Sequence, residues 1–157
     1  LVMYNSGGIV YLLKLPEERD LKIMNSMGKR VPAHGPASGK VLLAYQEPQE
    51  IERVLAGKLK PFTVHTITSP DALRAELEKI RKAGYAISDE EFKLGVYAVA
   101  IPVYDDMNQV IAALSVTRHK VSSTSQTQVT ELLQEMKMYS RLITEQLGQL
   151  GAGKRRH

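Results

Sequence analysis

The segment Val31–Lys40 has the residue types of a loop that could bind an anion. Gly35, Pro36 and Gly39 predict a tight loop that leads directly into a helix. Backbone N–H groups at the start of a helix are unpaired and attract negative charge, so those near Ser38 and Gly39 are candidates. A loop that only caps a helix would have the same pattern, and the spacing does not distinguish the two.

The same segment lacks the rest of a phosphate-binding loop. Ala37-Ser38-Gly39-Lys40 resembles the end of that motif, but the position five residues before Gly39 holds His34 instead of glycine. Val41 stands where serine or threonine would hold magnesium. We therefore expect no nucleoside triphosphate site here.

Ser115 and Thr117 are the second chemical feature. They lie two residues apart in the apolar segment Val110–Thr117, so in a strand they share one face. Two hydroxyls on an apolar strand could line a pocket that recognises an oxygen-rich ligand. A solvent-exposed face would give the same pattern, and periodicity does not choose between them.

Patterns for catalysis or metal binding are sparse. The absence of cysteine excludes disulfides, thiolate nucleophiles and cysteine-based metal sites. No two histidines lie four residues apart. Asp89-Glu90-Glu91 could supply a catalytic carboxylate pair, and a hydrolase that uses Asp89, Glu91 and His34 is one alternative function. Three adjacent acids are, however, more typical of a solvated turn. We expect no enzyme activity, no metal and no cofactor.

The strands that would position these residues come as hairpins. Asn5–Gly8 predicts a turn between an apolar strand at 1–4 and a strand at 9–15, and Asp105–Asn108 predicts a turn between strands Val96–Tyr104 and Val110–Thr117. Further strands are predicted at 21–26 and 85–88, and a loop at 28–39.

Helices are predicted at 40–46, 48–56, 70–83 and 125–150. The third is the best defined, because Ser69 is a cap, Pro70 suits the first turn and Gly84 suits the position after the last turn. Hairpins with irregularly placed helices favour an α+β fold, an antiparallel sheet flanked by helices, over a parallel doubly wound sheet.

Length and charge indicate one soluble domain. The chain has 157 residues, enough for one domain. It contains no run of about 18 apolar residues, so we expect no membrane span. No basic segment followed by an apolar stretch opens the chain, so we expect no signal peptide and a cytoplasmic location. The net charge is +4, but without Lys154, Arg155 and Arg156 the 21 basic residues become 18 against 17 acidic ones, or +1. We therefore expect a domain at 1–150 with little attraction to nucleic acid, and a basic tail at 151–157.

A series of motifs along the chain resembles one known family. Gly28-x-x-x-Pro32-x-His34-x-x-Ala37-x-Gly39-Lys40-x-x-Leu43-Ala44 is similar to the signature of the IclR-type effector-binding domain. The resemblance continues through Asp89-Glu90-Glu91-x-x-x-Gly95, Ala98-Val99-Ala100-x-Pro102 and Ala112-Ala113-Leu114-Ser115-Val116, and covers about residues 1–148. Many weak motifs in the family's order are together specific.

The resemblance implies a GAF-like α+β fold in a bacterial transcriptional regulator. Its N-terminal winged helix-turn-helix domain, absent from this chain, would make the only contact with DNA. Dimers or tetramers, and a small-molecule effector such as an organic acid, are also implied, with no membrane partner. An oligomerisation module without a functional pocket remains the alternative.

The ligand-binding positions that the resemblance implies come from several segments. They are Ile23, Ala37, Ser38, Ser88, Asp89, Ala98, Ser115 and Thr117. Relatives that bind small keto acids often carry an acid at the position of Ser88 and a cysteine at that of Ala98. The resemblance therefore leaves the identity of the effector open.

Overall fold

The computed structural model describes residues 1–15, 28, 30–120 and 125–154, with side chains as far as Gly148. The predicted strand at 21–26 lies outside the described residues. The elements follow in the order β1 (Val2–Asn5), β2 (Gly8–Tyr11), β3 (Arg30–Pro32), α1 (Ala37–Ala44), α2 (Pro48–Leu55), α3 (Pro70–Ala83), β4 (Ala86–Asp89), β5 (Val96–Tyr104), β6 (Val110–His119) and α4 (Gln126–Lys154).

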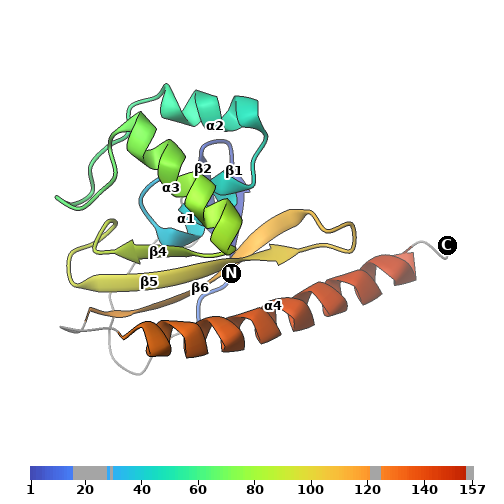
Figure 1. Ribbon diagram of the computed structural model, residues 1–157. Helices are drawn as coiled ribbons and strands as arrows, with labels where there is room; N and C mark the ends of the chain where they lie inside the picture. The colour runs from blue at the N-terminus through green and yellow to red at the C-terminus, as the bar shows by residue number, and fades with distance from the viewer. Residues whose placement is uncertain (16–27, 29, 121–124, 155–157) are drawn as a thin grey trace.

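The described strands form a six-stranded sheet in the order β3-β2-β1-β6-β5-β4. All five neighbouring pairs are antiparallel. Helices α1, α2 and α3 lie on one side of the sheet, and the long α4 runs along the other (Figure 1). The predicted α+β class with an antiparallel sheet flanked by helices is therefore confirmed.

The two predicted hairpins form around turns of the expected residue types. In the first, Ser6 and Gly7 both have positive φ, 45° and 81°, which suits a two-residue turn between twisted strands. In the second, the Asp105 carboxylate accepts hydrogen bonds from the N–H groups of Met107 and Gln109, at 2.9 and 2.8 Å. These local features explain why the sequence predicts both turns.

The predicted strand at 9–15 is too long, because β2 ends at Tyr11. Beyond Tyr11, the N–H groups of Leu12 and Leu13 both donate to the carbonyl of Leu1, at 2.9 and 3.3 Å, so the regular ladder with β1 ends there. Leu13 and Leu15 beyond it are 55% and 80% exposed. The length of this strand depends on its partner.

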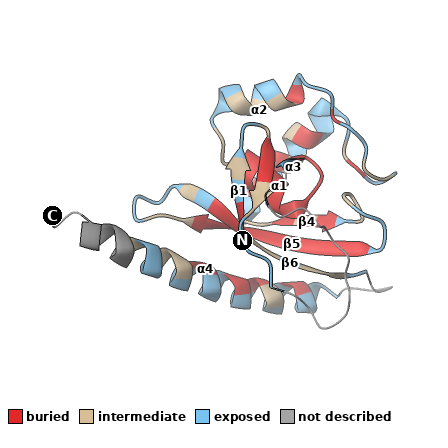
Figure 2. Ribbon diagram, turned by 180° about the vertical axis from the view of Figure 1, so that it is seen from behind, coloured by how far each residue is buried: buried red, intermediate tan, exposed pale blue. Residues whose placement is uncertain are grey.

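Strand β5 is the centre of the core and is buried along Val96–Val103 (Figure 2). Its residues alternate between two clusters, because successive side chains in a strand point to opposite faces. Ala98 and Ala100 pack in the cluster under α1, whereas Val99 and Ile101 pack against Val129, Leu133 and Met136 of α4. The sheet therefore separates a helix α1 side from a helix α4 side.

Two expectations around α1 are wrong. The predicted loop at 28–39 contains β3, which forms because Val31 pairs with Ile9 and is buried. Helix α1 begins at Ala37 instead of Lys40, and all eight of its residues are buried. A Cβ atom on Gly39 would overlap the carbonyl oxygen of Ala33, so glycine is required for this close approach of loop and helix.

Helix α3 has the predicted ends. The Ser69 hydroxyl accepts a hydrogen bond from the N–H of Ala72 at 3.4 Å, and Gly84 takes a left-handed conformation with φ of 76°. Both signals are local, which explains why the sequence predicts them.

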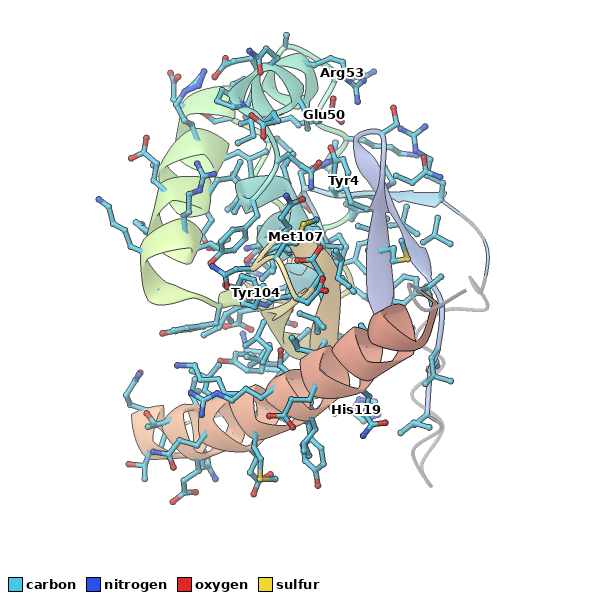
Figure 3. All side chains as sticks on the ribbon, turned by 90° about the vertical axis from the view of Figure 1, so that its right-hand side faces the viewer. Tyr4, Glu50, Arg53, Tyr104, Met107 and His119 are labelled. Carbon is cyan, nitrogen blue, oxygen red and sulfur yellow. The ribbon has the colours of Figure 1, made fainter. Side chains whose placement is uncertain are left out.

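Helix α2 is tied to the first hairpin by a polar cluster (Figure 3). The Tyr4 hydroxyl donates to the Glu50 carboxylate at 2.6 Å, and the Arg53 guanidinium donates to both carboxylate oxygens at 2.6 and 2.7 Å. These bonds from Arg53 and Tyr4 lower the pKa of Glu50 to about 2. The carboxylate is therefore charged at any physiological pH.

Within the described part of the chain, no helix combines the length and apolar character that crossing a bilayer requires.

Candidate functional site

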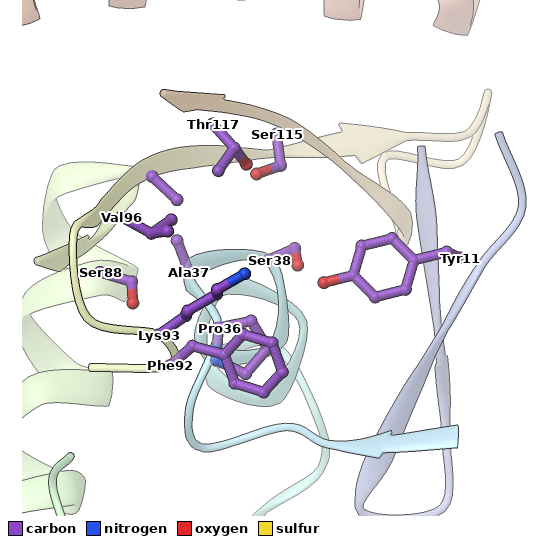
Figure 4. A pocket seen from close by; sticks show the side chains of 11 residues that line it. Tyr11, Pro36, Ala37, Ser38, Ser88, Phe92, Lys93, Val96, Ser115 and Thr117 are labelled. Atoms are coloured by element: carbon purple, nitrogen blue, oxygen red, sulfur yellow. The ribbon is translucent and has the colours of Figure 1, made fainter. Parts of the chain in front are cut away.

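A cavity lies between the start of α1 and the inner face of the sheet (Figure 4). The lining residues come from β2, the loop before α1, α1, β4, the loop after β4, β5 and β6. They are Tyr11, Pro36, Ala37, Ser38, Ser88, Phe92, Lys93, Val96, Ala98, Ser115 and Thr117. The space between the lining atoms, part of it open to solvent, is about 330 Å³.

Strand register brings the sheet residues of the site together. Ser88 pairs with Ala98 across β4 and β5, and Ala98 pairs with Thr117 across β5 and β6. The three therefore form one row on the α1 face, and Ser115 follows two residues along the same face of β6. Of the predicted ligand-binding residues, Ala37, Ser38, Ser88, Ala98, Ser115 and Thr117 all line this cavity.

Asp89 does not line it. As the neighbour of Ser88 in β4, it points to the opposite face, and its carboxylate lies 3.0 Å from the Lys120 ammonium. Its side chain is 49% exposed. Ile23 lies outside the described residues.

Sequence reasoning missed five of the lining residues. Phe92 and Lys93 directly follow the acidic run Asp89–Glu91, and Pro36 belongs to the predicted anion-binding loop, so both segments carried a sequence signal. Tyr11 and Val96 did not, because an aromatic or branched residue in a strand is usually a core residue. Their place in the cavity depends on how the first hairpin and β5 meet the helix.

Hydroxyl groups dominate the polar lining. The Ser88 hydroxyl donates to the carbonyl of Gly35 at 3.2 Å, which leaves its oxygen able to accept another hydrogen bond. Burial raises the pKa of Tyr11, although a hydrogen bond with Ser38 opposes the shift. The phenol is therefore protonated at neutral pH and able to donate.

The Gly39-Lys40 pair serves a structural purpose, not phosphate binding. Lys40 is completely buried, and its ammonium donates to the carbonyl of Ile87 at 2.8 Å and to both Glu91 carboxylate oxygens at 2.7 Å. Glu76 lies farther away, at 3.4 Å. Burial raises the pKa of Glu91, while Lys40 acts in the opposite direction. Lys40 thus joins α1 to β4 and to the loop after β4.

That loop is also held from outside. The Thr66 hydroxyl donates to the Glu91 carbonyl at 2.6 Å, and the Thr63 hydroxyl donates to the Glu90 carbonyl at 2.7 Å. The rings of Phe62 and Phe92 lie 4.8 Å apart. The segment 62–66 therefore fixes the loop that supplies Phe92 and Lys93 to the cavity.

The groups of the alternative hydrolase each have a structural partner. Glu91 is bound to Lys40, and Asp89 pairs with Lys120. His34 is buried, and its Nε2 donates to the carbonyl of Lys60 at 2.9 Å; burial lowers the pKa of His34. Among the residues that the structure describes, no group of three or more metal-ligating side chains is present. Asp89, Glu91 and His34 are thus each held in a contact with another part of the fold.

Comparison with known proteins gives a consistent result. Residues 1–145 match the family described as bacterial transcriptional regulator IclR C-terminal. The HTH-type transcriptional regulator KdgR of Escherichia coli (strain K12) is 37% identical over 114 residues, which cover 72% of this chain and 43% of that protein. The chain therefore spans less than half of that relative.

Solved structures share the fold. The crystal structure of the C-terminal domain of E. coli transcriptional regulator KdgR has a TM-score of 0.81 and 31% identity, over 94% of this chain and 85% of that one. The inducer-binding domain of an Acinetobacter PobR transcription factor double mutant, in complex with 3-hydroxybenzoic acid, has a TM-score of 0.79 and 28% identity, over 91% of this chain and 85% of that one.

Proposed function

The chain belongs to the IclR family of bacterial transcriptional regulators and corresponds to their C-terminal effector-binding domain, which has a GAF-like fold. We propose that the cavity under α1 is the effector site of this domain. The observation that carries the proposal is the row of Ser88, Ala98 and Thr117 facing the start of α1. The Ser88 hydroxyl is buried and the Thr117 hydroxyl half-buried on an otherwise apolar wall, which suits a small ligand with several oxygens.

An organic acid is the ligand class that we propose. The first turn of α1 lines the cavity with Ala37 and Ser38, and the N-terminus of a helix favours negative charge. The Acinetobacter neighbour holds a hydroxybenzoic acid, which supports an acid in this fold.

The proposed action is a shift between two arrangements of the whole regulator. A ligand that binds one arrangement better than the other increases its population, and a separate N-terminal winged helix-turn-helix domain would report the change to DNA. In this proposal the domain spans about residues 1–150, acts in the cytoplasm and contacts no DNA itself.

The test begins with thermal melting of the wild-type chain against small organic acids, sugar acids and aromatic acids. A ligand at 100 times its Kd adds about 2.7 kcal/mol of stability, a shift of several degrees for a domain of this size. The variant Ser115→Val/Thr117→Val should then bind that ligand at least about tenfold more weakly, because its oxygens lose hydrogen-bond partners.

The matched control is Thr130→Val, which removes a hydroxyl from exposed α4. It should bind the ligand with the wild-type Kd. If the double variant also keeps the wild-type Kd, Ser115 and Thr117 do not contact the effector.

We also propose that α4 is a surface for self-association. Met138, Tyr139 and Leu142 are 52%, 55% and 48% exposed on this helix, and large exposed apolar side chains in one region favour an interface. Sedimentation of wild type and Leu142→Glu would test it: an assembly that the charge dissociates is expected, and an unchanged mass would exclude this surface. A stable assembly that no acid stabilises would instead favour a module without a functional pocket.

A further inference from the structure

We propose that segment 60–66 closes the cavity under α1, and that Phe62 is the positioning residue of this closure. Phe62 does not line the cavity itself but contacts Phe92, which does. The inference rests on the proposed function of the cavity and adds its regulation. It assigns the entry and release of small molecules to a part of the chain in which the family resemblance implies no ligand-binding position.

The cavity wall that faces the sheet is made by two loop residues. Figure 4 shows Pro36 and Phe92 on the side of the cavity opposite Ser115 and Thr117. Pro36 belongs to the loop before α1, and Phe92 to the loop after β4. Ala98, in the middle of the sheet row, is only 9% exposed. Separation of these two loops would therefore open a path to the sheet side of the cavity.

Segment 60–66 forms hydrogen bonds with both loops. At the loop before α1, the buried His34 donates through Nε2 to the carbonyl of Lys60 at 2.9 Å. At the loop after β4, the Thr66 hydroxyl donates to the Glu91 carbonyl at 2.6 Å, and the Thr63 hydroxyl donates to the preceding carbonyl at 2.7 Å. The segment thus joins the two loops that form this wall.

Aromatic rings pack where the loops and the segment meet. The centroid of the Phe62 ring lies 5.4 Å from that of His34 and 4.8 Å from that of Phe92. Gly35 leaves the room for this packing, because a Cβ atom there would lie 2.7 Å from two carbons of the Phe62 ring and 3.0 Å from the Phe92 ring. Phe62 therefore fixes the place of Phe92 in the cavity wall.

The segment is suited to release without unfolding of the whole domain. Its outer side faces solvent, where Val64 is 88% exposed. Segments with few buried apolar contacts open locally at a lower free energy than the core. Lys40 holds Glu91 from inside the domain, so the loop stays anchored one residue before Phe92. In this inference, the fraction of molecules with the segment released sets how fast a small molecule reaches Ala98.

The chain has no cysteine, so an engineered thiol can report on access to the cavity. Ala98→Cys places the thiol in the cavity lining. Ala100→Cys places it on the same face of β5 but outside the lining, at a position that is 0% exposed. Modification by methyl methanethiosulfonate, a small neutral thiol reagent, is followed by mass spectrometry. Release of segment 60–66 exposes only the first thiol, whereas global unfolding exposes both.

Phe62→Ala should raise the modification rate of Ala98→Cys at least about tenfold, because loss of the ring contact increases the open population. Gly35→Ala should raise it as well, since its methyl group displaces the rings but removes no hydrogen-bonding group. Phe62→Tyr, which keeps the ring, should leave the rate close to that of the parent. In all three variants the rate at Ala100→Cys should stay unchanged.

Val64→Ala is the matched control within the segment, and it should change neither rate because this side chain is exposed. A purely structural role for Phe62 would raise the rates at both thiols together. Such a joint increase, or an unchanged rate at Ala98→Cys in both Phe62→Ala and Gly35→Ala, would overturn the inference.

The thiol assay contains no effector, so its failure and the failure of the proposed function are distinguishable. If Ser115→Val/Thr117→Val weakens effector binding and the thiol rates do not change, the cavity is the effector site but segment 60–66 does not close it. If the thiol rates change as expected and the double variant keeps the wild-type Kd, the segment closes a cavity that is not the effector site, and its assigned role in effector entry is wrong.

Discussion

Replacing Lys40 with methionine should destabilise the domain by about 3–5 kcal/mol, the usual cost of removing one partner from a buried ion pair. Methionine keeps much of the stem of this completely buried side chain but removes its ammonium. The Ile87 carbonyl then loses its donor, and the Glu91 carboxylate, whose side chain is only 13% exposed, loses its counter-ion.

The structure explains the size of this effect. At the observed 2.7 Å, the attraction between unit charges is roughly 6 kcal/mol for an effective dielectric constant of about 20. Part of this attraction only offsets the hydration that the two charges lose on burial. We therefore expect the loss of stability in Lys40→Met to be about half of the attraction or somewhat more. A domain of this size loses about 2–4 °C in melting temperature per kcal/mol, which predicts a fall of about 6–20 °C.

The assay is urea unfolding of wild type, Lys40→Met, Glu91→Gln and the double variant at one protein concentration. Each single variant leaves a buried charge without its partner at 2.7 Å, so the double variant should be less destabilised than the sum of the two singles. Arg74→Met is the control: it breaks an exposed pair with Glu52 at 2.9 Å and should cost no more than about 1 kcal/mol.

Two results would refute the reasoning about Lys40. One is a cost for Lys40→Met no larger than that of the Arg74 control. The other is strict additivity in the double variant, which would mean that the two side chains act independently despite their contact.

Two further predictions concern other parts of the fold. Gly39→Ala should destabilise by about 1–3 kcal/mol, because its Cβ would overlap the Ala33 carbonyl. Gly148→Ala, inside α4, should be neutral or slightly stabilising, because its Cβ would meet the Asp106 Cβ at an ordinary contact distance of 3.9 Å; urea unfolding of both variants checks this. If the Gly39 variant is as stable as wild type, the close approach of loop and helix does not require glycine. Because Arg53 and Tyr4 lower the pKa of Glu50 from 4.5 to about 2, the carboxylate stabilises the fold above pH 4.5 and progressively less as the pH falls toward 2. The melting temperature of wild type should therefore exceed that of Glu50→Gln at pH 7, and the difference should shrink between pH 4.5 and 2; a constant difference would contradict the assigned pKa.

The candidate site was predictable where its residues follow a strand pattern. Ser115 and Thr117 share a face by spacing alone, and their cavity position follows once β5 and β6 pair as the hairpin requires. The family motif also indicated Asp89, which is adjacent to Ser88 in the sequence. Adjacent strand residues face opposite sides of the sheet, so Ser88 lies in the cavity and Asp89 does not.

The sequence by itself determined the features that depend on local interactions. The turns of both hairpins and the ends of α3 each follow from residues within a few positions of one another. Backbone conformation, capping and strand periodicity act at that range, so short patterns are sufficient to predict them.

Only the tertiary structure decided which distant segments meet. Strand β3 exists because β2 offers a partner, and Lys40 finds Glu91 across 51 residues of sequence. Tyr11 and Lys93 come from opposite parts of the chain to line one cavity. Pairing and burial depend on partners far along the sequence, and no local pattern contains that information.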